Sequence, residues 1–127
     1  MILPCIYIAP AGTMGRGVFT SRDIEKDTAV ELSPVIVMSA KERELLDQTL
    51  LHDYIFEWGP GKEKCGMALG YIAVYNHAYY ANCEYEMDYD QALIKVKAVR
   101  FINRGEQLFI NYNGNWDDQK PLWFDAQ

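Results

Sequence analysis

The sequence contains few cysteines, and they are not arranged in pairs. The three are Cys5, Cys65 and Cys83, and no two of them have CxxC spacing. An odd number of well-separated cysteines is typical of reduced thiols rather than of a disulfide framework, and structural zinc sites are usually built from closely spaced ligands. We therefore expect three free thiols and no structural zinc site.

The chain also lacks a long hydrophobic run. Residues 1–8 contain no basic residue and are too short for the apolar part of a signal peptide. No later stretch approaches the roughly 20 consecutive apolar residues that span a bilayer. We therefore expect a soluble intracellular protein that makes no membrane contact, located in the cytoplasm if the host is a bacterium.

Positive charge is in short supply as well. Twelve lysines and arginines stand against 18 acidic residues, which gives a net charge of -6. Binding to nucleic acid requires a basic surface that neutralises phosphates, so this class of function is disfavoured. The acidic balance suits a basic partner, such as a lysine-rich peptide, or it serves only to keep the domain soluble.

What the chain does contain is apolar residues in short runs. It has 127 residues, half of them apolar, which is enough for one domain with a modest core. The apolar positions mostly alternate with polar ones or form β-branched runs between turn residues. The pattern predicts strands over residues 5–9, 18–20, 29–38, 54–58, 67–74, 93–99 and 107–112. The expected fold class is mainly β, with several small sheets.

One segment departs from the strand pattern. Ser39 and Glu42 have the spacing of a capping box, and leucines follow at helical spacing. This predicts a short inserted helix that begins after Ser39 and ends near Asp53.

A glycine-rich stretch occupies residues 12–17, with the sequence GTMGRG. Its spacing is not that of a dinucleotide-binding loop, and a strand-like run follows it rather than a helix. Because glycine has no Cβ and tolerates positive φ, the backbone of this loop could approach a ligand closely. The alternative is an ordinary turn.

The stretch from Tyr75 to Asn82 is unusually rich in polar and aromatic side chains, and it follows an apolar run. Asn76 can donate and accept hydrogen bonds, and His77 can do either, so the segment could bind the edge of an adenine. A buried histidine within an aromatic core is an equally good interpretation. His52 and His77 are the only histidines and no paired cysteine or histidine motif is present, so we expect no metal site.

A third stretch runs from Gly105 and Glu106 through Leu108 to Asn111 and Tyr112. It reads as a strand that ends in a tyrosine before an Asn-Gly turn. On its own, such a tyrosine usually lies at a sheet edge with its hydroxyl in water.

Taken in this order, the three stretches resemble the SET family of protein-lysine methyltransferases, and most closely its small stand-alone bacterial and viral members. The resemblance covers nearly the whole chain and implies a single SET domain over residues 1–127, with an insert near 39–66 and a short aromatic segment over 113–127. It also implies a C-terminal pseudoknot, in which the stretch from Tyr75 to Asn82 passes beneath the segment ending at Tyr112.

The resemblance implies S-adenosylmethionine as the methyl donor and a lysine ε-amine of a protein as the acceptor. Tyr112 falls on the family's catalytic tyrosine. The residues that would bind the donor are Gly15, Arg16, Gly17, Tyr75, Asn76, His77 and Tyr112. Those that would line the lysine channel are Tyr54, Tyr85, Ile110 and Trp123. Monomethylation is slightly favoured if Tyr85 points into the channel.

The sequence departs from the family at several positions. The family pattern NHSxxPN reads NHAYYAN here, so Ala78 and Ala81 replace a serine and a proline. The family's cysteine-rich zinc segment is absent, and Trp123 could close the lysine channel or pin the chain to the core. The alternative functions are a non-catalytic lysine-peptide-binding module and a β-rich interaction protein. A homodimer is a further expectation from the small viral members.

Overall fold

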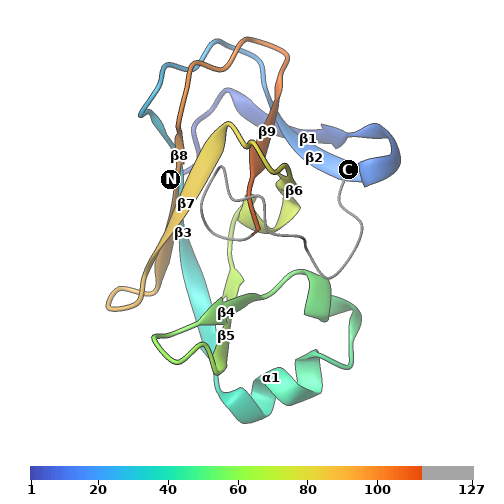
Figure 1. Ribbon diagram of the computed structural model, residues 1–127, viewed down its shortest axis with the longest axis vertical. Helices are drawn as coiled ribbons and strands as arrows, with labels where there is room; N and C mark the ends of the chain where they lie inside the picture. The colour runs from blue at the N-terminus through green and yellow to red at the C-terminus, as the bar shows by residue number, and fades with distance from the viewer. Residues whose placement is uncertain (113–127) are drawn as a thin grey trace.

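The computed structural model describes residues 1–112, which form two small sheets (Figure 1). The first has the strand order β1-β2-β9-β6. Its strands are β1 (Ile6–Pro10), β2 (Arg16–Thr20), β9 (Gln107–Ile110) and β6 (Asn76–His77). The β6 strand runs parallel to β9, whereas the other neighbours are antiparallel. A strand from late in the sequence therefore lies between two much earlier ones.

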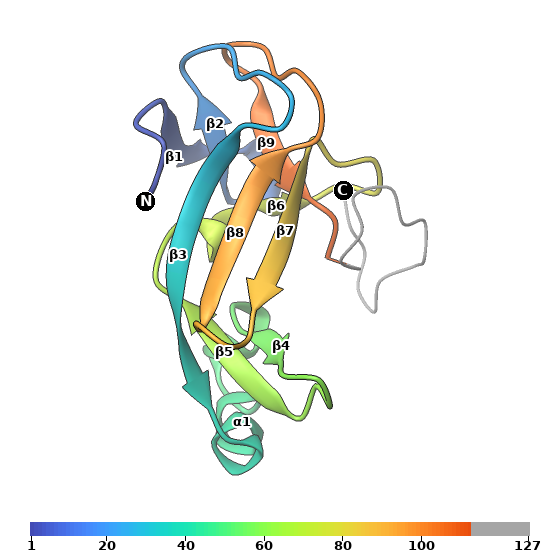
Figure 2. The ribbon, with the colours of Figure 1, turned by 90° about the vertical axis from the view of Figure 1, so that its left-hand side faces the viewer.

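The second sheet has the order β4-β5-β3-β8-β7. Its strands are β4 (Phe56–Trp58), β5 (Lys64–Ala68), β3 (Ala29–Met38), β8 (Leu93–Ala98) and β7 (Cys83–Asp88). The long β3 pairs with β8 through its first half and with β5 through its second. In Figure 2 the outer face of β3, β8 and β7 is turned toward the viewer, and no element of residues 1–112 lies over it. The mainly β fold of several small sheets is thus confirmed.

The core lies between the sheets and is built from inward-facing strand residues. Alternation along β8 buries Ile94, Val96 and Ala98, each 0% exposed, as expected for a sheet with one solvated face. Val18, Leu108 and Ile110 bring β2 and β9 into the same cluster. The site strands therefore rest on a continuous apolar core.

The helical elements are short. They are η1 (Gly12–Met14), α1 (Ala40–Leu46), η2 (Leu50–Asp53) and η3 (Ile72–Val74). The predicted capping box is present, since Ser39 Oγ accepts from Glu42 N at 3.1 Å and Glu42 Oε1 accepts from Ser39 N at 3.0 Å.

Two of the predicted element boundaries are wrong. The helix ends at Leu46 rather than near Asp53, because Thr49 accepts a hydrogen bond from Leu51 N and starts a separate 3-10 turn. The predicted strand over 67–74 is instead β5 followed by η3. The chain leaves the ladder after Ala68, and Ile72 N donates to the buried carboxyl of Glu31 rather than to a strand.

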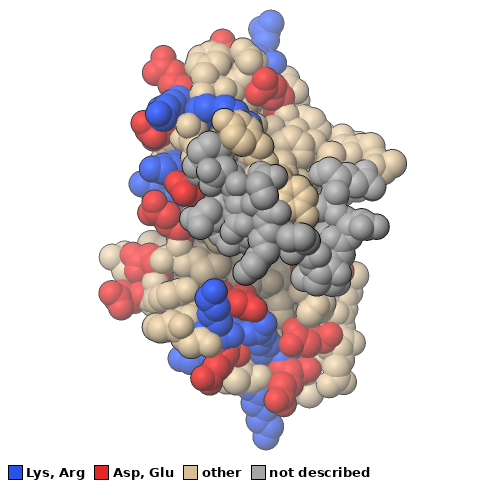
Figure 3. All heavy atoms as spheres, viewed as in Figure 1, with Lys and Arg blue, Asp and Glu red and all other residues tan. Residues whose placement is uncertain are grey.

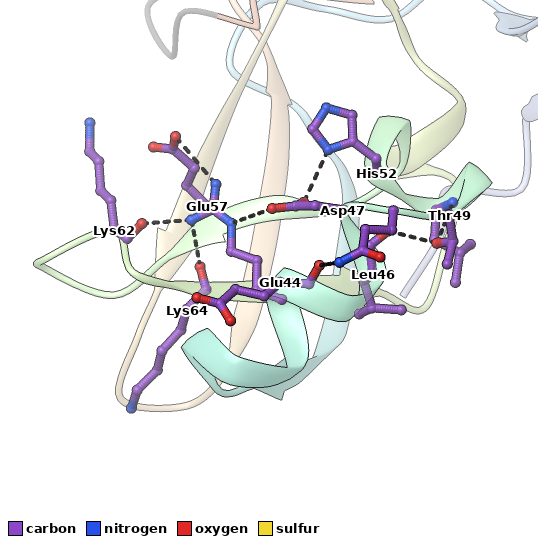
Figure 4. Close-up of polar contacts among 11 residues, drawn as sticks. Glu44, Leu46, Asp47, Thr49, His52, Glu57, Lys62 and Lys64 are labelled. Atoms are coloured by element: carbon purple, nitrogen blue, oxygen red, sulfur yellow. Dashed lines mark hydrogen bonds and ion pairs between the residues drawn. The ribbon is translucent and has the colours of Figure 1, made fainter.

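The insert between β3 and β5 is fastened by polar contacts, since α1 contains no buried residue. Arg43 donates to the carbonyl oxygens of Lys62 at 2.7 Å and Lys64 at 3.3 Å (Figure 4). It also forms ion pairs with Asp47 at 3.8 Å and Glu57 at 3.6 Å. One arginine thus joins the helix to the β4–β5 hairpin.

Charged side chains of both signs are interspersed on the described part of the face in Figure 3, including the surface of the insert. Within residues 1–112, no helix is long and apolar enough to cross a membrane. No group of three or more histidine, cysteine or acidic side chains in this range could hold a metal ion.

Candidate active site

The glycine-rich loop and the polar stretch meet where β2, β9 and β6 lie together. Asn76 Nδ2 donates to the Arg16 carbonyl at 3.0 Å and to Gln107 Oε1 at 2.8 Å. A Cβ on Gly17 would collide with the Gln107 side chain and would lie 3.0 Å from Asn76 Nδ2. A larger residue at position 17 would have to displace the Gln107 side chain, which is the hydrogen-bond partner of Asn76.

The preceding glycine is required for a different reason. Gly15 has a φ of +78°, which L side chains rarely adopt, and no atom lies within 4 Å of the position that its Cβ would take. The loop backbone is therefore open to the outside at Gly15, beside the exposed Arg16. This leaves space in which a ligand could approach the main chain.

His77 is held by a hydrogen bond to a residue 35 positions later in the sequence. Its Nδ1 accepts a hydrogen bond from Tyr112 N at 3.0 Å, and burial lowers the pKa of the ring. The neutral ring therefore carries its proton on Nε2. That atom is buried and has no hydrogen-bond partner within residues 1–112. Buried donors are normally satisfied, so this one points to a ligand.

Tyr112 closes the same site from the end of β9. Its hydroxyl donates to the Tyr75 carbonyl at 2.8 Å, and its ring lies 5.1 Å from that of His77. Burial raises the pKa of Tyr112 to about 12, with further contributions from Tyr54 and Tyr85. The phenol of Tyr112 therefore lies within electrostatic range of those of Tyr54 and Tyr85.

The other residues expected to line a lysine channel differ in how deeply they are buried. Tyr85 is half-buried on β7 with its ring 5.9 Å from Phe56, and burial raises its pKa to about 12. Tyr54 is 39% exposed. Ile110 is 0% exposed and packs in the core, so its side chain lies behind the site rather than at its surface. Trp123 lies outside the described residues.

The loop that lacks the family's serine and proline is held by other means. Arg100 donates to the carbonyls of Ala81 at 2.6 Å and Tyr80 at 3.2 Å, and its guanidinium stacks 4.6 Å from the centre of the Tyr80 ring. Asn111 Nδ2 donates to the Tyr79 carbonyl at 3.1 Å. These hydrogen bonds fix the loop, where the family has a serine and a proline, through the carbonyls of residues 79, 80 and 81.

Asn82 joins the loop to the neighbouring strand. Its Nδ2 donates to the Gln107 carbonyl at 2.9 Å and its Oδ1 accepts from Phe109 N at 2.8 Å. Together with the parallel β6–β9 pair, these contacts place the stretch from Tyr75 to Asn82 directly against the segment that ends at Tyr112. This is the arrangement expected of the pseudoknot.

The sequence analysis did not single out Gln107 or Arg100. Gln107 is on a predicted strand and Arg100 follows one, and nothing in the local pattern distinguishes them from solvated strand residues. Only the tertiary fold brings Gln107 to Asn76 and Arg100 to the loop, so composition and spacing carried no signal for either residue.

The structure brings together a glycine loop, an Asn-His strand and a partly exposed tyrosine on small β sheets. This is the arrangement expected of the lysine methyltransferase class that the sequence resembles. The chain matches the SET domain family over residues 15–113. It is 35% identical over 114 residues to a Schizosaccharomyces pombe histone-lysine N-methyltransferase specific for lysine 37 of H3, covering 89% of this chain and 72% of that one. The chain therefore belongs to the SET domain family.

Solved structures support the same fold. A candidate histone methyltransferase of Plasmodium falciparum superposes with a TM-score of 0.66 at 26% identity, covering 87% of this chain and 95% of that one. An autoinhibited ctPRC2 bound to S-adenosylmethionine gives a TM-score of 0.71 at 22% identity, covering 85% of this chain and 15% of that one. At that identity, the second likeness concerns the fold alone.

Proposed function

We propose that the protein transfers a methyl group from S-adenosylmethionine to the ε-amine of a lysine in a protein substrate. It is a protein-lysine methyltransferase by its membership of the SET domain family and by its identity to a histone-lysine N-methyltransferase. S-adenosylmethionine is its methyl donor. The observation that carries the proposal is the hydrogen bond from the Tyr112 hydroxyl to the Tyr75 carbonyl, beside a buried His77 nitrogen that has no partner within residues 1–112.

The donor site in this proposal is formed by the glycine loop and β6. The open backbone at Gly15, the side chain of Arg16 and the closely packed Gly17 would line one wall. The two protons of Asn76 Nδ2 already form hydrogen bonds to Arg16 and Gln107. Asn76 Oδ1 is therefore left to accept a hydrogen bond from the ammonium group of S-adenosylmethionine. His77 Nε2 would donate to a ring or carboxylate acceptor. The donor would supply an activated methyl group.

The lysine channel in this proposal is formed by Tyr54, Tyr85 and Tyr112. A free lysine amine has a pKa of about 10.4 and is a nucleophile only when neutral. Partly buried phenols exclude water from the amine and so disfavour its charged form. The side chain of Ile110 would act indirectly, as the core residue on which this wall rests.

Tyr112 would orient the reacting groups rather than remove a proton. With a pKa of about 12, its phenol stays protonated at neutral pH and can donate to the Tyr75 carbonyl. Its oxygen lone pairs would then face the channel. Holding the amine in line with the methyl group accounts for much of the expected rate, because alignment replaces a bimolecular encounter.

The finer identity of the substrate is also a proposal. A net charge of -6 would steer a basic acceptor towards the protein, and histone H3 is the natural first probe because the Schizosaccharomyces pombe relative is specific for it. An intracellular location and a homodimer belong to the same proposal. A monomeric mass in sedimentation equilibrium would contradict the proposed homodimer.

Calorimetric titration with S-adenosylhomocysteine tests the donor site. We expect saturable binding by the wild type and loss of binding in Asn76→Ala. The matched control is Asn103→Ala, an exposed position whose side chain donates to Glu106, and it should bind as the wild type does. If the folded wild-type protein does not bind S-adenosylhomocysteine, even with lysine peptide present, the proposed enzymatic function is contradicted. The alternative of a non-catalytic lysine-peptide-binding module would then remain.

Labelled-methyl transfer to recombinant histone H3 tests the chemistry. Tyr112→Phe should retain S-adenosylhomocysteine binding and lose about two to three orders of magnitude in kcat, since one oriented hydroxyl is removed. Tyr7→Phe, at an exposed tyrosine stacked on Phe19, is the control and should keep full activity.

A further inference from the structure

A carboxyl group is completely buried behind the candidate active site. Glu31 lies on β3 and is 0% exposed. Its Oε2 accepts a hydrogen bond from Ser33 Oγ at 2.6 Å and another from Ile72 N at 3.1 Å. The second bond reaches from the sheet to the first residue of η3, which leads directly into Tyr75.

The other oxygen of this carboxyl and the Tyr75 hydroxyl are buried as well. Neither Glu31 Oε1 nor the Tyr75 hydroxyl makes a hydrogen bond within residues 1–112. Burial, and then the charge of Glu31, raise the pKa of Tyr75. Glu31 is therefore hydrogen-bonded to the first residue of η3, and its charge acts on the tyrosine that follows the last residue of η3.

The turn approaches Glu31 too closely for a larger residue. A Cβ on Gly70 would collide with Ser33 Oγ and Glu31 Oε2. Gly70 thus packs directly on the carboxyl, and the hydrogen bond from Ile72 N to Glu31 ties η3 to β3.

Stability alone is a weak reason for this arrangement. Burying a carboxyl group is unfavourable unless it is fully paired, and an apolar side chain of similar size usually serves a core at least as well. What Glu31 provides that an apolar residue would not is directional bonding to η3. That turn sets the orientation of the Tyr75 carbonyl, to which Tyr112 donates at 2.8 Å.

We propose that Glu31 is a positioning residue for Tyr112, acting through η3 and the Tyr75 carbonyl. This inference rests on the proposed function, because it concerns how the tyrosine of that site is aimed. Glu31 fixes η3, η3 fixes the Tyr75 carbonyl, and the carbonyl binds the phenolic proton of Tyr112. The phenol then presents its lone pairs to the channel in one fixed direction.

The variants are chosen to separate positioning from folding. Glu31→Leu removes every hydrogen bond at similar volume, whereas Glu31→Gln keeps an acceptor for Ser33 and Ile72. Tyr75→Phe removes only the hydroxyl that faces Glu31 and leaves the carbonyl in the chain. Ile102→Val, at a core residue that is 0% exposed and pairs with Ile24, is a control for general destabilisation.

The first readout needs no activity. In protein labelled with ¹³C at tyrosine Cζ, the Tyr112 signal is assigned by its absence from Tyr112→Phe. We expect Glu31→Leu to shift this signal and to lower the apparent pKa of Tyr112, since a donated hydrogen bond favours the protonated phenol. Tyr75→Phe should shift it in the same direction, and Glu31→Gln and Ile102→Val should not. An unchanged Tyr112 signal in folded Tyr75→Phe and Glu31→Leu would overturn the proposal.

The second readout is methyl transfer to recombinant histone H3. Glu31→Leu should lower kcat about tenfold or more with KM within about twofold, and Glu31→Gln should recover most of the loss. If Glu31→Leu does not fold, Tyr75→Phe carries the test alone, and wild-type kcat in that variant would overturn the proposal. An inactive wild type with the expected ¹³C shifts would contradict the proposed function and leave the positioning inference standing.

Discussion

His77 must remain neutral for the site to keep its geometry. Its Nδ1 accepts from Tyr112 N at 3.0 Å, and a proton on that nitrogen would replace the bond with a repulsive contact between two donors. Burial already lowers the pKa of the ring, which disfavours protonation in the folded state. A mild acid environment should therefore weaken the fold at this residue.

The expected pH dependence follows from proton linkage. Because the pKa of His77 is lower in the folded state, the unfolded state binds more protons as the pH falls through about 6.5. The free energy of unfolding should thus be highest above that pH and should decrease towards lower pH. Urea unfolding at pH 7.5, 6.5 and 5.5 measures this slope.

The control for this prediction is His77→Asn, which retains an acceptor but does not titrate in this range. The two proteins are otherwise identical, so the difference between the two slopes isolates His77. Equal slopes in wild type and His77→Asn would contradict the prediction.

Single residues of the site were partly predictable. Asn76, His77 and Tyr112 could be singled out because their side-chain chemistry is unusual for their local pattern. Glu31 could not, because an acidic residue in a long strand reads as solvated and only the bulge between Ala29 and Glu31 turns it inward. The two interpretations of His77, buried or ligand-binding, turn out to be compatible, since the ring is buried and one nitrogen stays without a partner in residues 1–112.

At the level of elements, the insert is the part held by the fewest buried contacts. The α1 helix has no buried residue, and Leu45 on it is 64% exposed. Segments with little apolar burial tend to open locally without global unfolding. Arg43, which links α1 to the β4–β5 hairpin, should therefore control the stability of this segment.

Arg43→Met should free the insert without unfolding the domain. Loss of two hydrogen bonds to carbonyls corresponds to about 1–2 kcal/mol, or roughly tenfold faster amide exchange in α1 and β5. Hydrogen exchange followed by mass spectrometry measures this exchange rate. Lys41→Met, an exposed position on the same helix, is the matched control and should exchange as the wild type does. Unchanged exchange in Arg43→Met would show that other contacts hold the insert.

The elements themselves were predicted with uneven success, for physical reasons. The bounds of β3 match the prediction, because a β-branched run between turn residues is a strong signal. The β7 strand was missed although Cys83–Asp88 alternates, since three of its six residues are acidic and its pairing with β8 is a tertiary effect. The two-residue β6 exists only through its pairing with β9 and has no local signal.

For the whole molecule, thiol reactivity tests the packing. Cys65 and Cys83 are 0% exposed, whereas Cys5 is only partly buried. Burial raises the pKa of Cys65, and it raises the pKa of Cys83 to about 12, so neither forms the reactive thiolate near neutral pH. Iodoacetamide should label the native protein once, at Cys5.

Intact-mass measurement checks this prediction. The native protein should gain one carbamidomethyl group, and protein unfolded in guanidinium chloride should gain three, which also verifies that the chain has no disulfide. Labelling of Cys83 as fast as Cys5 in the native protein would mean that the β7–β8 face of the core opens readily.

The position of β9 between β2 and β6 also sets an order of events during synthesis. Residues 16–20 and 76–77 have no strand between them until residues 107–110 leave the ribosome. A nascent chain stalled before residue 107 would therefore have its glycine loop and Asn-His pair but not the strand that lies between them. Binding of the methyl donor should appear abruptly once β9 has emerged from the ribosome, which marks the moment at which the newly made chain becomes competent.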